Sequence, residues 1–143
     1  MTLLIKNGSD VNMIDRLGWT PLCQSIARLR LDMAKILIAS GANPNLLTAS
    51  GRSPLSRAIY LQSLKIVTFL VENGANMNTF DADGYSPFHK AVQSDDANIL
   101  RYFIQNSAKS KAKNIDGDKA FEVALKKKKQ YAVKLLLQDK SNF

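Results

Sequence analysis

The sequence predicts an all-α solenoid in which short helix pairs stack on one another and a hairpin-like loop projects between neighbouring pairs. The first observation is that glycines at positions 18, 51, 84 and 117 are always 33 residues apart. The second is that Gly8, Gly41 and Gly74 keep this step, and the third is that Asn12, Asn45 and Asn78 keep it too. A repeat period of about 20–50 residues is typical of solenoids, so one structural unit is expected to recur along the chain.

Each unit contains a signal for the start of a helix. Thr20, Ser53 and Ser86 each stand directly before a proline. Hydroxyl residues are good N-caps because they accept a hydrogen bond from an unpaired N–H of the first turn. Proline suits the first helical position because its missing N–H has no partner to lose there. The first helix of the first full unit is therefore expected over residues 21–28.

A second helix is expected a few residues later in each unit. Met33, Ile36 and Leu37 have the spacing of one helix face. Gly41 and Gly74 follow where a helix end favours a left-handed residue, and an extended segment and a turn are expected next. Small residues that would let neighbouring helices approach closely recur at the same step: Ser25, Ala58, Ala91 and Ala124.

The sequence at this point resembles the ankyrin-repeat family. Residues 86–91 match its Thr-Pro-Leu-His-type opening, and residues 70–78 match its Leu-Leu-x-x-Gly-Ala-x-x-Asn ending. The resemblance implies a single ankyrin-repeat domain over residues 1–143. Its expected parts are a partial repeat at 1–14, full repeats at 15–47, 48–80 and 81–113, and a degenerate capping repeat at 114–143.

The chain departs from the family pattern in three places. The family usually has a glycine between its two helices, so the turns here must hold a left-handed residue or bend differently. The fourth unit has Lys119 and Ala120 instead of the cap and the proline, as expected of a terminal repeat. Because the chain starts with half a unit, we expect it to be a piece of a longer protein or an incomplete gene model. The residues between the helices are Leu29, Gln62, Asp95 and Lys128.

Composition excludes several classes of protein. No run approaches the ~18 apolar residues of a membrane span. The single cysteine, Cys23, excludes an intrachain disulfide, and we expect a cytoplasmic or nuclear location. The net charge of +8 comes mainly from residues 107–143, which carry ten lysines and four acidic residues. This favours a local basic patch, so nucleic acid is not expected as the main partner.

No pattern of catalytic or metal-binding residues is present. His89 is the only histidine, and the resemblance implies that it supports neighbouring loops. It lies two units from Cys23, and each unit adds about 8–10 Å, so the two residues are not expected to pair. Residues 81–84 begin like a calcium loop but lack the later ligands. We therefore expect no enzyme activity, no cofactor and no metal.

The resemblance implies that another protein binds the loop tips and the concave side of the first helices. Trp19, Arg52 and Tyr85 follow the repeating glycines, one in each unit, and these residue types are frequent in binding hot spots. The alternative is that the aromatic residues only pack on the neighbouring loop. The other candidates, at the loop tips and the ends of the first helices, are Arg16, Leu17, Arg28, Ser50, Tyr60, Leu61, Asp83, Gln93, Asp116 and Asp118.

The lysine run Lys126–Lys129 has several interpretations. It would suit an anionic partner, a nuclear-import signal or lipid head groups, but we favour a solvated turn in a capping unit. The expected function is that of a monomeric scaffold or adaptor that binds another protein. The alternative is a regulatory segment of a larger enzyme, channel or ubiquitin-ligase adaptor.

Overall fold

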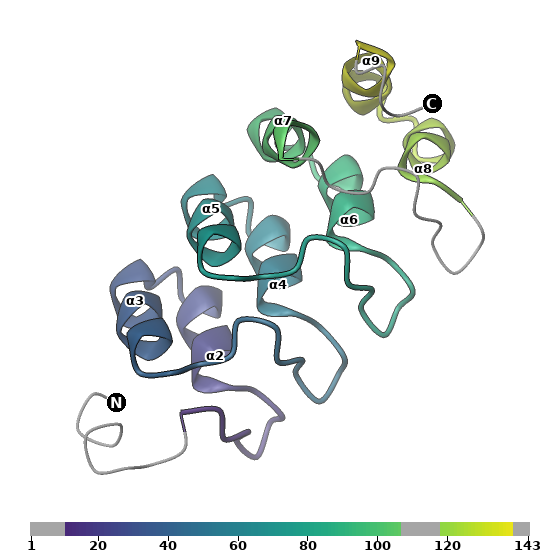
Figure 1. Cartoon of the computed structure of the whole chain (residues 1–143). Helices are drawn as coiled ribbons and strands as arrows, with labels where there is room; N and C mark the ends of the chain where they lie inside the picture. Colours follow the sequence, from purple (N-terminus) through teal and green to yellow (C-terminus); the bar gives the residue numbers. More distant parts are fainter. Residues whose placement is uncertain (1–10, 107–117, 139–143) are drawn as a thin grey trace.

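The computed structural model describes residues 11–106 and 118–138, and within these ranges it contains eight helices and no strand. The helices form two rows (Figure 1). The inner row is α2, α4, α6 and α8, in which each helix contacts the next, and the outer row is α3, α5, α7 and α9. The bounds are α2 Pro21–Ala27, α3 Leu31–Ala39, α4 Pro54–Tyr60, α5 Leu64–Glu72, α6 Pro87–Gln93, α7 Ala97–Gln105, α8 Ala120–Lys126 and α9 Gln130–Gln138. The predicted all-α solenoid is confirmed.

The inner helices begin where the sequence predicts. The Thr20 hydroxyl accepts a hydrogen bond from the Cys23 backbone N–H at 3.1 Å, and Ser53 and Ser86 accept the equivalent bonds at 3.1 and 3.3 Å. The fourth inner helix has no hydroxyl cap. There the Lys119 backbone N–H donates to the Glu122 carboxylate at 2.7 Å, which satisfies one of the unpaired donors at the helix start.

The turns between paired helices adopt both of the expected solutions. Leu29, Gln62 and Lys128 are left-handed, with φ of 57°, 57° and 55°. The turn between α6 and α7 bends differently, because Ser94 is extended (φ −72°, ψ 159°) and Asp96 caps α7 with its carboxylate.

The projecting loops are tight hairpin-like turns (Figure 1). In the first, the Asp15 N–H donates to the Trp19 carbonyl at 2.9 Å and the Gly18 N–H donates to the Asp15 carbonyl at 3.0 Å. The next two loops repeat both bonds. Gly18 has φ of +82°, and a Cβ there would lie 2.3 Å from the Ala49 Cβ, so the loop requires glycine. The fourth loop lies outside the described residues.

The core runs between the two rows of helices with the period of the repeat. Equivalent positions in the outer helices hold Leu37, Leu70, Phe103 and Leu136, which are all fully buried. The predicted small residues of the inner helices, Ser25, Ala58, Ala91 and Ala124, are buried as well. Among the described helices, none is both long and apolar enough to cross a membrane.

Candidate functional site

Two hollows lie next to each other along the inner helices and share Arg52 and Arg57. The larger, about 540 Å³, lies between α4 and α6, and the smaller, about 290 Å³, lies between the first two loops. We call them together the inner groove. Its lining residues are Trp19, Cys23, Thr48, Ser50, Arg52, Ser53, Ser56, Arg57, Ile59, Tyr60, Gln62, Asp83, Tyr85, Lys90, Gln93, Ser94, Asp95 and Lys127.

Seven of the predicted site residues line the inner groove: Trp19, Ser50, Arg52, Tyr60, Asp83, Tyr85 and Gln93. Tyr60 is the most exposed aromatic residue among them, with 71% of its surface accessible. Tyr85 is half-buried and packs against the core, with its ring edge-on to the His89 ring at 6.0 Å. Tyr60 is therefore better placed than Tyr85 to contact a ligand, because Tyr85 also packs against the core.

The other predicted residues lie away from the groove. Arg16 and Leu17 are exposed at the first loop tip, and Leu61 packs against the core. Arg28 lines a separate hollow of about 300 Å³ beside α2 and α3. Asp118 pairs with Lys126 at 2.7 Å, and Asp116 lies outside the described residues.

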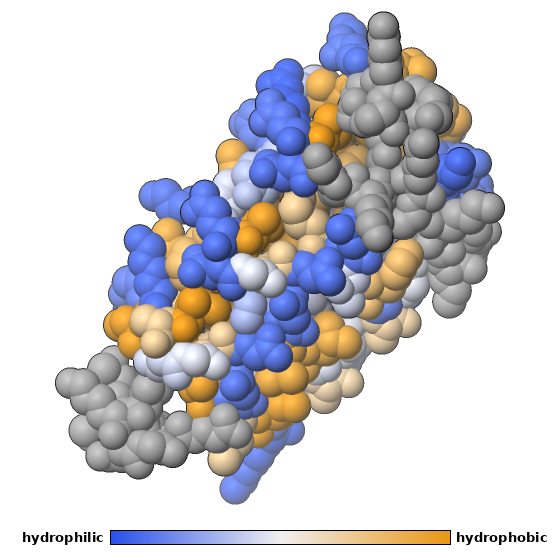
Figure 2. Space-filling view, in the orientation of Figure 1, coloured by the Kyte–Doolittle hydropathy of each residue, from blue (hydrophilic) through white to orange (hydrophobic). Residues whose placement is uncertain are grey.

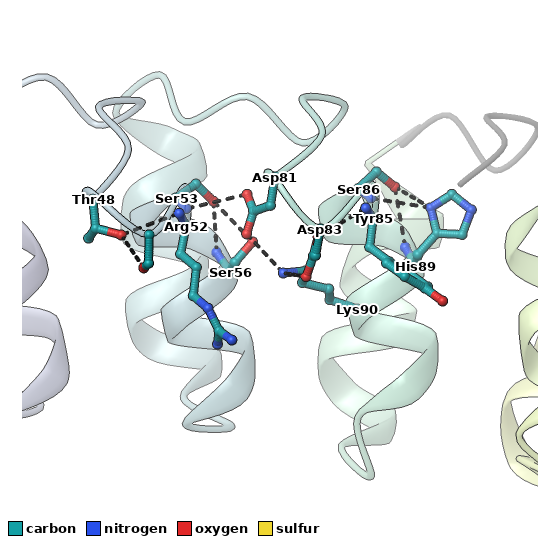
Figure 3. Close-up of polar contacts among 11 residues, drawn as sticks. Thr48, Arg52, Ser53, Ser56, Asp81, Asp83, Tyr85, Ser86, His89 and Lys90 are labelled. Atoms are coloured by element: carbon teal, nitrogen blue, oxygen red, sulfur yellow. Dashed lines mark hydrogen bonds and ion pairs between the residues drawn. The ribbon is translucent and has the colours of Figure 1, made fainter. Parts of the chain in front are cut away.

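A polar network fixes the floor of the groove (Figure 3). Lys90 of α6 lies between Asp81 and Asp83 of the preceding loop and contacts each at 2.8 Å. Asp81 is almost completely buried and also accepts a hydrogen bond from the Ser53 backbone N–H at 3.3 Å. Partial burial would raise the pKa of Asp83, but the hydrogen bonds from Lys90 and the Tyr85 N–H, with the charges of Lys90 and Arg52, outweigh it. The pKa of Asp83 is therefore lowered.

Arg57 is a central groove residue that was not predicted from the sequence. Its guanidinium lies 5.0 Å from the Trp19 ring centroid and 5.7 Å from that of Tyr60. A cation over an aromatic face is attracted by the ring electrons, so these contacts hold the arginine across two units. The 33-residue register could have indicated it, because Arg57 is equivalent to Gln24 and Lys90, which also contact the loops.

The surroundings of His89 and Cys23, the one histidine and the one cysteine of the chain, give each a structural role. The His89 Nε2 lies 3.0 Å from the Asp118 carbonyl, which can only accept, so Nε2 carries the proton and Nδ1 accepts from the Ser86 hydroxyl at 2.7 Å. Burial raises the pKa of the Cys23 thiol, although Thr20 and Arg57 oppose this, so the reactive thiolate is disfavoured. In the described part of the chain, no three His, Cys, Asp or Glu residues are grouped so that they could hold a metal.

The lysine run crosses the turn between α8 and α9. Lys126 pairs with Asp118 and Lys129 pairs with Asp95, each at 2.7 Å. Lys128 is the left-handed turn residue, and Lys127 lines the inner groove. Hydrophobic and hydrophilic residues are interspersed on the face shown in Figure 2.

Comparison with known proteins gives one family. The family model for ankyrin repeats matches residues 1–81 with three copies, and no curated protein matches the chain. The helix pairs and capped inner helices continue with the same step beyond the matched range, through α6, α7, α8 and α9. The chain belongs to the ankyrin-repeat family.

Proposed function

We propose that this chain is a scaffold or adaptor whose inner groove binds a segment of another protein. Ankyrin repeats are generally protein–protein interaction modules. In this chain the groove lies on the inner helices and the projecting loops. The observation that carries the proposal is the row of Trp19, Arg57 and Tyr60 along the groove, joined by Arg52. Trp, Tyr and Arg supply most of the binding energy in many interfaces.

The loops beside the groove are held in place by backbone hydrogen bonds before any partner binds, which supports this proposal. Each of the three described loops is closed by two backbone hydrogen bonds. The Ala49 N–H donates to the Gly18 carbonyl at 2.8 Å, and the Ala82 N–H donates to the Gly51 carbonyl at 2.9 Å, so each loop is also tied to the next. A surface that is already ordered loses less entropy when a partner binds.

The proposal assigns no catalytic residue. Cys23 and His89 are 1% and 0% exposed, so a substrate in the groove would not reach them directly. The groove residues that a partner would meet are aromatic and charged side chains, which suit recognition.

Affinity purification with mass spectrometry tests the proposal. The bait is the full chain as wild type, as the Arg52→Ser/Tyr60→Ser double variant, or as the control Tyr131→Ser. Tyr131 is also exposed, at 47%, but lies on α9 away from the groove. We expect proteins enriched on wild type and control to fall at least about tenfold on the double variant, since lost hot-spot contacts cost about 1.4 kcal/mol or more.

Thermal unfolding of each bait is measured in parallel. The double variant should keep its midpoint within a few degrees of wild type, because both replaced side chains are exposed. If the same proteins are recovered equally on all three baits, the inner groove is not the binding surface.

A further inference from the structure

Arg57, in the middle repeat, lacks the acidic partner that the equivalent residues in the two neighbouring repeats have. In the unit before, Gln24 donates to the Asp15 carboxylate, and in the unit after, Lys90 pairs with Asp81 and Asp83. The positions equivalent to Asp81 and Asp83 in the middle unit hold Thr48 and Ser50. Their hydroxyls lie 2.9 Å apart and bond to each other. Arg57, which is equivalent to Lys90, therefore has no carboxylate in its own loop.

The position of Arg57 leaves a hydrogen-bond donor unused. Among the described residues, its Nε is the one buried side-chain nitrogen or oxygen without a hydrogen-bond partner. The rings of Trp19 and Tyr60 attract the positive charge but accept no in-plane hydrogen bond. A buried donor without an acceptor is costly. Because this nitrogen has almost no accessible surface, a ligand would recover that cost only if the Arg57 side chain turned toward it.

The charges around Arg57 favour an acidic ligand. Of the groove carboxylates, Asp83 is already paired with Lys90, and Asp95 is paired with Lys129. Arg52 lines both hollows beside Arg57 and makes no ion pair within the described part of the chain. The charge of Arg52 acts on Asp83, but that carboxylate is already bonded to Lys90. Arg52 and Arg57 therefore face the groove without an ion pair of their own among the described residues.

We infer that the partner of the inner groove is an acidic protein segment, with an Asp or Glu carboxylate paired to Arg57 and a second acidic contact at Arg52. This inference rests on the proposed function and names its partner class. The flat guanidinium fork matches a carboxylate with two parallel hydrogen bonds, and lysine would not reproduce this geometry. A nucleic acid would need a longer track of unpaired cations. Of the lysines in and beside the groove, Lys90 and Lys129 are paired with aspartates, which leaves Lys127 as the lining lysine without an ion pair among the described residues.

A random dodecapeptide display library, selected on the full wild-type chain, tests this inference. We expect the enriched peptides to share one acidic position. For a synthetic copy, changing that Glu to Gln should weaken binding to wild type at least tenfold, and the same change should weaken binding to Arg57→Gln less than twofold. Arg57→Lys should lose most of the affinity despite keeping the charge.

Arg101→Gln is the matched control, because Arg101 also lies over an aromatic ring, Tyr131, at 5.7 Å, but is on α7 outside the groove. It should bind like wild type. The comparison of the Glu and Gln peptides on the wild-type chain needs no protein variant. The inference therefore stays testable if Arg57→Gln fails to fold.

The remaining outcomes separate the two proposals. Peptides that lose binding on Tyr60→Ser but are indifferent to their own acidic residues would overturn the acidic partner and leave the proposed function standing. No enrichment, or enrichment unaffected by Tyr60→Ser, would overturn both. If a 20-nucleotide single-stranded DNA binds more tightly than any selected peptide and depends on Arg57, the partner is a nucleic acid and the inference is wrong.

Discussion

Lys90 places a charged group in a largely buried part of the repeat. Its side chain is 14% exposed, and that of its partner Asp81 is 1% exposed. Asp81 also receives the Ser53 N–H from the preceding unit, so the ion pair connects α6, its own loop and the start of α4. Removing one partner of a buried ion pair leaves the other charge without compensation, which costs more than the pair itself contributes.

Lys90→Met is therefore expected to lower the free energy of unfolding by about 3 kcal/mol, because the buried Asp81 carboxylate loses its counter-charge. Urea denaturation followed by circular dichroism measures the change. Lys35→Met is the control, since Lys35 is exposed on α3 and should change the stability by less than about 0.5 kcal/mol. A loss below about 1 kcal/mol in Lys90→Met would show that water or another group compensates Asp81.

At the residue scale, the register predicted which side chains recur along one face better than it predicted the surroundings of each. Trp19, Arg52 and Tyr85 were expected as a row from the register alone, and all three line the inner groove. The half-burial of Tyr85 depends on its contact with the core and His89, which the register does not specify. Arg57 was missed because what distinguishes it, the lack of acids at positions 48 and 50, shows only when this unit is compared with the next one.

At the scale of the elements, the turns between paired helices carry backbone strain. The left-handed region costs a residue with a side chain about 1–2 kcal/mol, and Leu29, Gln62 and Lys128 all occupy it. Glycine occupies the same region without this cost but loses more entropy on folding, by roughly 0.5–1 kcal/mol. The balance favours glycine at these turns.

Gln62→Gly is thus expected to stabilise the chain by about 0.5–1 kcal/mol, since the relieved strain exceeds the added entropy cost. The measurement is the free energy of unfolding in urea. Asp95→Gly, at the equivalent turn without a positive φ, should instead destabilise by roughly 0.5–1 kcal/mol through the added entropy cost, because the exposed Lys129 ion pair that it also removes contributes little. Equal effects of both changes would mean that φ does not decide the preference.

Helix starts could be predicted from the sequence more fully than the turns. A hydroxyl residue and a proline determine a helix start locally, and the inner helices α2, α4 and α6 begin at the predicted prolines. The α6–α7 turn could not be predicted, because it depends on competition between two local conformations. There the Asp96 carboxylate accepts from the Asn98 and Ile99 N–H groups at 2.9 and 3.2 Å, which starts α7 without a left-handed residue.

At the scale of the whole molecule, stability depends on how strongly each unit is tied to the next. The Asn45 amide receives the Asn76 backbone N–H at 2.8 Å and donates to the Gly74 carbonyl at 3.0 Å. Asn12 makes the equivalent pair of bonds to Asn43 and Gly41 at 2.7 and 3.4 Å. The asparagine series that defined the register in the sequence thus couples neighbouring units. In repeat proteins such interface contacts decide whether the units unfold together.

Asn45→Ala is expected to separate the unfolding of the first full unit from the rest. Two bonds between units are lost, which weakens their coupling by about 2 kcal/mol. Trp19, the only tryptophan, reports on that unit by fluorescence, while far-ultraviolet circular dichroism reports on all helices. In urea the two signals should coincide for wild type, and in Asn45→Ala the fluorescence transition should come first. Asn73→Ala, which removes only a local bond to Phe69, should keep them coincident, and coincidence in Asn45→Ala as well would show that the packed helices alone couple the units.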